Sequence, residues 1–75
     1  MPNATGLRQI REQLGVTQEA VARRTRLGLR TYIRAEGRNR VTYDTARQIL
    51  EAINGLLEEA GQPSVTLDDL ELTLY

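Results

Sequence analysis

Two short stretches that each suit a helix, separated by a turn of three to four residues, constrain the fold of this chain most. The first, residues 18–24, follows Thr17, whose hydroxyl suits the N-cap of a helix. The second, residues 28–36, carries Tyr32 and Ala35 at a spacing that places both on one face. The small alanines of the first stretch let another helix approach closely, so we expect the pair to share one core.

Longer helical patterns flank this pair on both sides. Apolar residues at positions 7, 10 and 14 predict a first helix, and Gly15 suits its C-terminal end. A stripe of apolar residues predicts a fourth helix from Thr42 to Gly61. Gly55 lies inside this stripe and costs about 1 kcal/mol relative to alanine, so a kink or a break is expected there.

Residues 65–75 fit two patterns. Thr66 and Asp69 resemble the start of a helix, whereas leucines at 70, 72 and 74 alternate with polar residues as in a strand. We expect one helical turn over 66–70 and then an extended segment. Such a strand has unpaired edges, so it either pairs with a second copy or folds back on its own helices.

The composition argues against catalysis. The 75 residues contain no histidine, cysteine or lysine, which removes most metal sites, thiol chemistry and the commonest general base. We expect no enzyme, no metal and no cofactor. No apolar run approaches the length of a membrane span and no signal peptide is visible, so we expect a cytoplasmic protein without a membrane partner.

The formal net charge of zero hides an uneven distribution. Residues 1–40 hold nine arginines and three glutamates, a net charge of +6, whereas residues 41–75 have a net charge of −6. Four of the arginines lie within the stretch GLRTYIRAEGRNR, residues 28–40. Such asymmetry suggests a nucleic-acid face on one side of the molecule, the alternative being an ordinary solvated helix face.

The spacing of the two short helices is that of a helix-turn-helix. In addition, three sequence segments resemble the phage repressor/Cro type of this motif, the XRE family, over residues 6–54: LRQIREQLGVTQEAVA, TYIRAEGR and TYDTARQILEAI. The resemblance implies an all-α bundle of four to five helices that binds double-stranded DNA through its third helix. It also implies a transcriptional regulator, most often a repressor, acting as a homodimer.

The residues expected at the DNA fall into three groups. The polar front of the third helix comprises Leu29, Arg30, Thr31, Ile33 and Arg34. By resemblance, Leu29, Arg30 and Arg34 match base-reading positions. The resemblance also assigns phosphate contacts to the start of the second helix and the loop after the third: Thr17, Gln18, Arg38, Asn39 and Arg40. Finally, Arg11 and Glu36 match a structural ion pair of the family.

Several positions depart from the family pattern. Arg26 stands in the turn where glycine is common, which puts its left-handed conformation in doubt. Gly28 replaces the usual Ser or Thr cap. Tyr32 and Ala35 replace an aliphatic pair, an exchange that is expected to tilt the helix.

These observations divide the chain into a helix-turn-helix DNA-binding domain, residues 1–61, and a C-terminal tail, residues 62–75. The tail is a candidate dimerisation segment through Leu70, Leu72, Leu74 and Tyr75. An alternative function is an antitoxin or adaptor whose acidic C-terminal half binds a partner protein.

Overall fold

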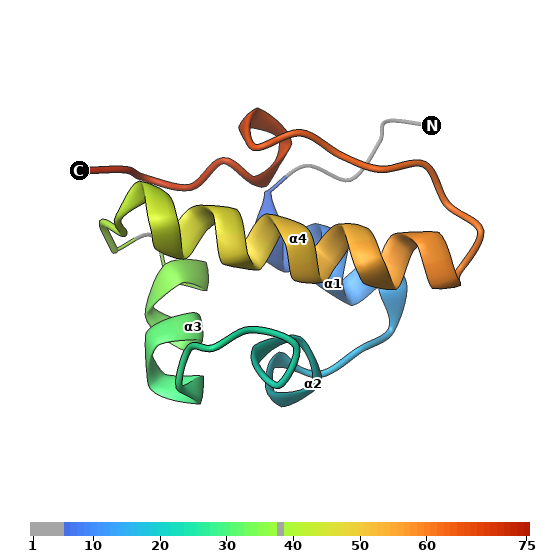
Figure 1. Cartoon of the computed structure of the whole chain (residues 1–75), viewed down its shortest axis with the longest axis horizontal. Helices are drawn as coiled ribbons and strands as arrows, with labels where there is room; N and C mark the ends of the chain where they lie inside the picture. The colour runs from blue at the N-terminus through green and yellow to red at the C-terminus, as the bar shows by residue number, and fades with distance from the viewer. Residues whose placement is uncertain (1–5, 38) are drawn as a thin grey trace.

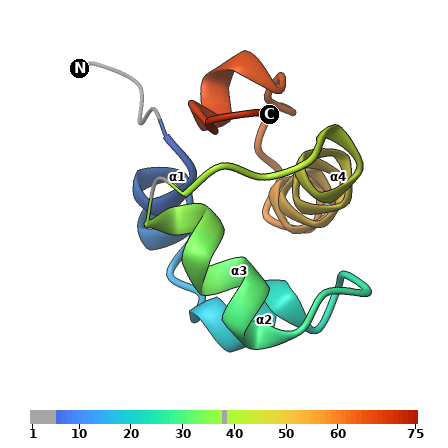
Figure 2. The ribbon, with the colours of Figure 1, turned by 90° about the vertical axis from the view of Figure 1, so that its left-hand side faces the viewer.

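The computed structural model describes residues 6–37 and 39–75, which form a small bundle of helices with an irregular tail over it (Figures 1 and 2). The elements are α1 (Leu7–Leu14), α2 (Gln18–Ala22), α3 (Leu29–Glu36), α4 (Tyr43–Glu59) and the 3-10 helix η1 (Asp68–Leu70). α4 crosses the molecule, with α2 and α3 on one side of it and the tail running back along the other (Figures 1 and 2). The predicted all-α class is confirmed, with four α-helices in the described ranges.

Side-chain caps define where two of these helices begin. The hydroxyl of Thr17 accepts a hydrogen bond from the backbone N–H of Ala20 at 3.0 Å. Thr42 does the same for Thr45 at 3.1 Å. Each such cap stabilises its helix by about 1 kcal/mol, which matters for an element as short as α2. α3 starts at Gly28 without any side-chain cap.

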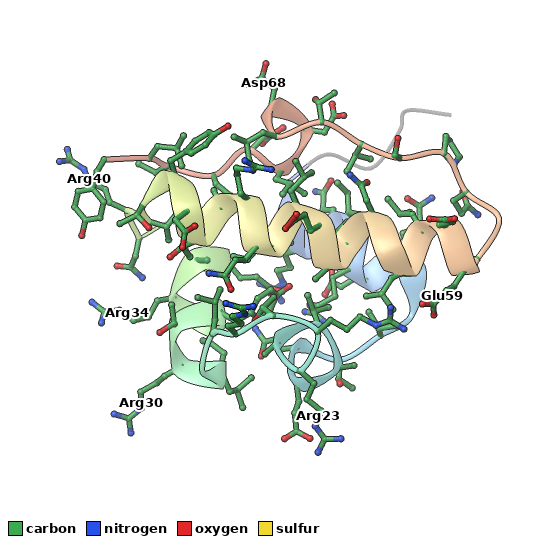
Figure 3. All side chains as sticks on the ribbon, viewed as in Figure 1. Arg23, Arg30, Arg34, Arg40, Glu59 and Asp68 are labelled. Atoms are coloured by element: carbon green, nitrogen blue, oxygen red, sulfur yellow. The ribbon has the colours of Figure 1, made fainter. Side chains whose placement is uncertain are left out.

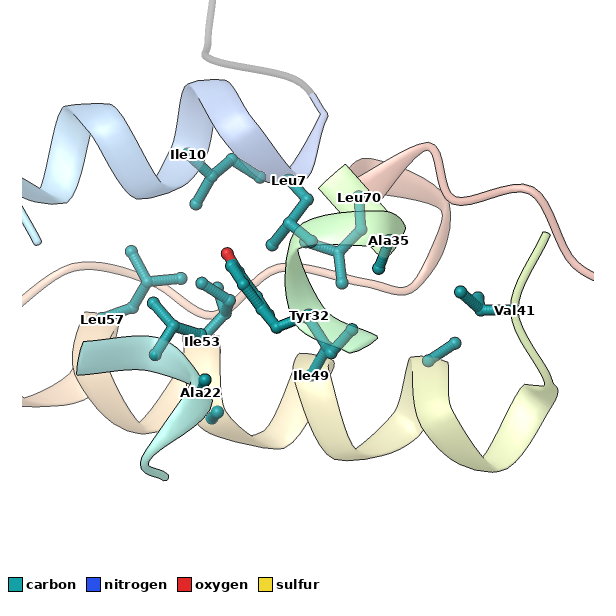
Figure 4. Close-up of a cluster of buried hydrophobic side chains, with 13 residues drawn as sticks. Leu7, Ile10, Ala22, Tyr32, Ala35, Val41, Ile49, Ile53, Leu57 and Leu70 are labelled. Carbon is teal, nitrogen blue, oxygen red and sulfur yellow. The ribbon is translucent and has the colours of Figure 1, made fainter. Parts of the chain in front are cut away.

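The core gathers side chains from all four helices and from the tail (Figure 4). Tyr32 lies at its centre, fully buried, and Ala35 lies beside it, so the prediction that these two face inward is confirmed. The buried residues are Leu7, Ile10, Val21, Ala22, Tyr32, Ala35, Val41, Ala46, Ile49, Ala52, Ile53, Leu57 and Leu70.

Gly55 does not kink α4, which is one continuous helix of 17 residues. Ile53 and Leu57, on either side of the glycine, are buried and hold the helix against the core. Arg24 also covers this position, because a methyl group placed on Gly55 would lie 3.5 Å from its Nη1 atom. The same guanidinium donates to both carboxylate oxygens of Glu59, at 2.6 and 2.7 Å. These contacts offset the modest cost of a helical glycine.

The turn between α2 and α3 is closed without a left-handed residue at Arg26, since Glu71 is the only non-glycine with a positive φ in the described chain. The hydroxyl of Thr25 donates to the carbonyl of Ala22 at 2.7 Å and accepts from the N–H of Leu27 at 3.0 Å. The N–H of Arg26 donates to the side chain of Gln48 at 3.0 Å. A threonine hydroxyl therefore does here what a left-handed glycine does elsewhere.

The tail departs most from expectation. Asn54 holds its start, donating to the carbonyl of Val65 at 3.1 Å and accepting from the Val65 N–H at 2.8 Å. Leu70 at the end of η1 is only 1% exposed. Val41 then pairs with the far end, its N–H donating to Thr73 at 2.9 Å and its carbonyl accepting from Tyr75 at 3.1 Å. The tail clasp is our name for three features together: the contacts of Asn54 with Val65, the burial of Leu70, and the pairing of Val41 with residues 73–75.

The predicted strand over residues 70–75 is wrong: the described chain contains no strand, and residue 74 makes only an isolated parallel bridge with Val41. The alternation is broken because Leu70 is needed in the core and Glu71 then adopts a left-handed conformation with φ 53°. The expected helical turn is present as η1, at Asp68–Leu70. Because Leu70 is buried in its own chain, its side chain offers nothing to a second copy.

Candidate nucleic-acid interface

The front of α3 presents two kinds of side chain to solvent. Tyr32 and Ala35 occupy the core side of α3. Helical geometry therefore turns Leu29, Arg30, Ile33 and Arg34 outward. All four are exposed, Leu29 by 39% and Ile33 by 42%. The two aliphatic residues lie one helical turn apart, and so do the two arginines. Thr31 is also exposed and lies beside Arg34 in a shallow notch between α3 and the start of α4.

Three arginines extend along one edge of the molecule. Arg30, Arg34 and Arg40 all point outward on the side where α3 and the start of α4 meet (Figure 3). None of them forms an ion pair or a side-chain hydrogen bond within residues 6–37 and 39–75. Glu59 and Asp68 lie on other sides of the molecule (Figure 3). Arg24, by contrast, is paired with Glu59. The guanidinium groups of Arg30, Arg34 and Arg40 are therefore free to bind an anion.

The residues expected at the start of α2 are occupied by structural contacts. The hydroxyl of Thr17 is the N-cap acceptor of α2. Gln18 is partly buried, and its side-chain amide donates to Oε1 of Glu36 at 3.1 Å. An amide nitrogen carries two protons, so one donor of Gln18 remains for another acceptor. The sequence pattern did not indicate the contact with Glu36.

The loop after α3 divides between a structural and a free residue. Asn39 donates to the carbonyl of Arg34 through its backbone N–H at 3.2 Å and its side-chain amide at 3.1 Å. It thereby satisfies a carbonyl at the C-terminal end of α3. Arg40 is exposed. Arg38, also expected at the DNA backbone, lies outside the described residues.

On the inner side of α3, the side chains of three residues meet at Glu36. Nε of Arg11 donates to Oε2 of Glu36 at 2.6 Å, and Nη2 donates to Oε1 at 3.3 Å. The hydroxyl of Tyr32 donates to Oε2 at 2.5 Å, and Gln18 supplies the fourth contact. Arg11 also donates to the carbonyl of Val16 at 2.9 Å. We call Arg11, Gln18, Tyr32 and Glu36 the Glu36 network; it joins α1, α2 and α3.

The ionisation of Glu36 follows from these contacts. Burial disfavours its charged form, but the hydrogen bonds from Arg11, Tyr32 and Gln18 outweigh burial and hold the pKa of Glu36 below its usual 4.5. Burial and the bond to the carboxylate raise the pKa of Tyr32 well above its usual value. The side chains of Glu36 and Arg11 are only 4% and 13% exposed. The ion pair anticipated from the sequence is present, and its carboxylate is unavailable to repel phosphate.

Sequence reasoning missed the Tyr32 hydroxyl as a member of this network. The signal was available, because residues four apart on a helix are neighbours and a buried tyrosine hydroxyl requires a partner. No comparable signal pointed to the contact between Val41 and residues 73–75, which pairs backbone groups far apart in the chain.

Comparison with known families places the chain among the helix-turn-helix proteins. The family Helix-turn-helix (HTH_3), which comprises the XRE/Cro/C1-type domains, matches residues 7–59, more than half of the chain. This protein therefore belongs to that family, which binds DNA and is not a family of enzymes. Searches among curated proteins and among solved structures find no match.

Two further observations concern other kinds of site. Among residues 6–37 and 39–75, no three acidic side chains come together in a way that would hold a metal ion. None of the helices in the described chain combines the length and apolar character needed to cross a membrane.

Proposed function

We propose that this protein is a sequence-specific transcriptional regulator, acting as a repressor by occupying its operator with α3 in the major groove. The observation that carries the proposal is the front of α3, where Arg30 and Arg34 have no partner in the described chain and are free to donate. The Glu36 network supports it, because it fixes the helix from behind. A rigid support of this kind preorganises the reading side chains.

The roles of the arginines follow from their positions. Arg30 and Arg34 lie on the helix that enters the groove, where one arginine can donate to both O6 and N7 of a guanine, giving about 1–3 kcal/mol of discrimination. Arg40 lies at the margin, beside the start of α4, and binds a phosphate of the DNA backbone. The remaining donor of Gln18 and the N-terminal N–H groups of α2 suit another phosphate.

Selection of bound sites from random duplex DNA tests this proposal. We expect one sequence to be enriched, with affinity that falls steeply as salt rises. Arg40→Ala should weaken binding to specific and random DNA alike and reduce the slope of log affinity against log salt by about 1. Arg34→Ala should instead relax the preference for one base pair. Equal losses on both DNAs for Arg34→Ala would contradict its reading role.

The rival function is an adaptor or antitoxin whose acidic half binds a partner protein. It gains support if no site is enriched and a stoichiometric protein co-purifies with the chain. Enrichment of a defined site would favour the regulator.

We also propose that the protein binds as a two-fold dimer through the free edge of the tail. Val41 uses the backbone groups of Thr73 and Tyr75, so those of Leu74 point the other way and make no hydrogen bond in the described chain. The side chains of Leu74 and Tyr75 are exposed, by 38% and 83%. This free backbone edge also includes Leu72. The edges of two copies can pair with each other across a two-fold axis. Because Leu70 is buried in its own chain, it is the one residue of the predicted dimer interface that cannot contact a second copy.

Sedimentation tests the dimer. Leu74→Pro removes the N–H on the free edge while leaving the bonds of Val41 in place, so we expect it to produce monomers. Tyr75→Ala, which leaves the backbone intact, should weaken association less. A Leu74→Pro variant that sediments as a dimer would contradict pairing through this edge.

A further inference from the structure

The front of α3 is divided lengthwise into an aliphatic stripe and an arginine stripe. At 3.6 residues per turn, Leu29 and Ile33 fall on the side of α3 that adjoins the start of α2, and Ile33 lines a shallow depression with Gln18. Arg34 falls on the other side and lines a notch with Arg40. Large aliphatic side chains that are left exposed singly are ordinary, but a pair one turn apart on the reading face is a feature that requires an explanation.

The chemistry of the groove supplies that explanation. The only apolar group that unmodified DNA presents in the major groove is the methyl group on C5 of thymine. Building on the proposed DNA-binding function, we propose that Leu29 and Ile33 read thymine methyl groups while Arg30 and Arg34 read guanine. Residues four apart on a helix, such as Leu29 and Ile33, are separated by about 6 Å along its axis, and DNA rises about 3.4 Å per base pair. The two methyl groups therefore lie within about two base pairs of each other.

The neighbouring charges favour DNA over an apolar protein surface as the occupant. Arg30 and Arg34 flank the stripe on the same helix and have no ion-pair partner in the described residues. An apolar protein surface covering this face would bury two guanidinium groups without acceptors, which is costly. A duplex groove supplies methyl groups together with guanine acceptors, and so satisfies both stripes at once.

The test uses the site selected from random duplex DNA, with each thymine replaced in turn by deoxyuridine. This replacement removes one methyl group and keeps every hydrogen-bonding atom. Burying one methyl group corresponds to about fourfold in affinity. We therefore expect one or two positions where uracil weakens binding of the unaltered protein about fourfold. At those positions Leu29→Ala or Ile33→Ala should bind thymine and uracil equally well.

Arg34→Ala is the matched control on the same helix: it should lose affinity overall and keep its sensitivity to the methyl group. Both aliphatic residues are exposed, so their replacement should not unfold the protein, and a thermal melt checks this.

The outcomes separate this inference from the function on which it rests. If the selected site is bound tightly and no uracil replacement changes affinity by more than about twofold, methyl reading is overturned and the DNA-binding proposal stands. If no duplex is enriched, both are overturned. If Leu29→Ala and Ile33→Ala change the sedimentation of the free protein and leave the methyl dependence intact, the stripe is a protein contact and the inference also fails.

Discussion

The Glu36 network and the tail clasp each hold distant segments together, by different means. The network is charged: a carboxylate accepts from the side chains of three other residues behind α3. The tail clasp is uncharged: it consists of one amide side chain, one buried leucine and two backbone hydrogen bonds at Val41. The network fixes the orientation of α3, whereas the clasp closes the core. Substitutions should therefore have different signatures in the two regions.

The largest effect is expected from Glu36→Ala, because it leaves Arg11 nearly buried without its partner. We expect the free energy of unfolding to fall by about 3–4 kcal/mol, measured by urea denaturation. The control is Glu12→Ala, which removes an exposed glutamate from a loose contact with Arg8 at 3.5 Å. That change should cost less than about 0.5 kcal/mol. Similar losses for both variants would show that the network contributes no more than a surface pair.

In the tail clasp, Leu70→Ala should lower the free energy of unfolding by about 2–3 kcal/mol, because it opens a cavity in the core. The same substitution at Leu74, which is 38% exposed, should cost under about 1 kcal/mol when measured at concentrations where the protein is monomeric. This pair of variants distinguishes a tail in which Leu70 alone is buried from a strand in which Leu70 and Leu74 lie on the same face and are buried alike. Equal losses at the two positions would contradict the burial of Leu70.

The smallest effect is a dependence on pH that the network should show and the tail clasp should not. The pKa of Glu36 is lowered by folding, so its contribution is present above the pKa of the unfolded chain and is lost as pH falls through the lowered folded value. The difference in unfolding free energy between the unaltered protein and Glu36→Gln should therefore shrink between pH 7 and pH 3. Asn54→Ala, which removes two uncharged contacts of the clasp, should show the same loss at both values. A constant difference for Glu36→Gln would contradict the lowered pKa.

The same contrast explains what the sequence could predict. Helix starts at Thr17 and Thr42, the burial of Tyr32 and the pairing of Arg11 with Glu36 all follow from local chemistry or from the family pattern. The contact of Gln18 with Glu36 does not, because spacing along the chain does not tell which of several acceptors a flexible amide will choose.

The tail was predicted least well, for a physical reason. Alternation of leucines is equally compatible with a two-sided strand and with one residue inserted into a core. Here the core settles the choice, because Leu70 is buried in the same cluster as Leu7 and Ala35, and that cluster exists only in the assembled fold. Similarly, the hydroxyl of Thr25 replaced the expected glycine in the turn, a substitution that residue preferences alone do not reveal.

The burial of Leu70 also has a consequence for the order in which the chain folds. Leu70 packs in the same cluster as Leu7, and 63 positions separate the two (Figure 4). Helical proteins usually fold fast because most of their contacts are local, whereas distant contacts must first overcome the entropy of closing a loop. In this protein one core side chain, Leu70, comes from the C-terminal end of the chain. We therefore expect closure of the tail, rather than formation of the helices, to limit the folding rate.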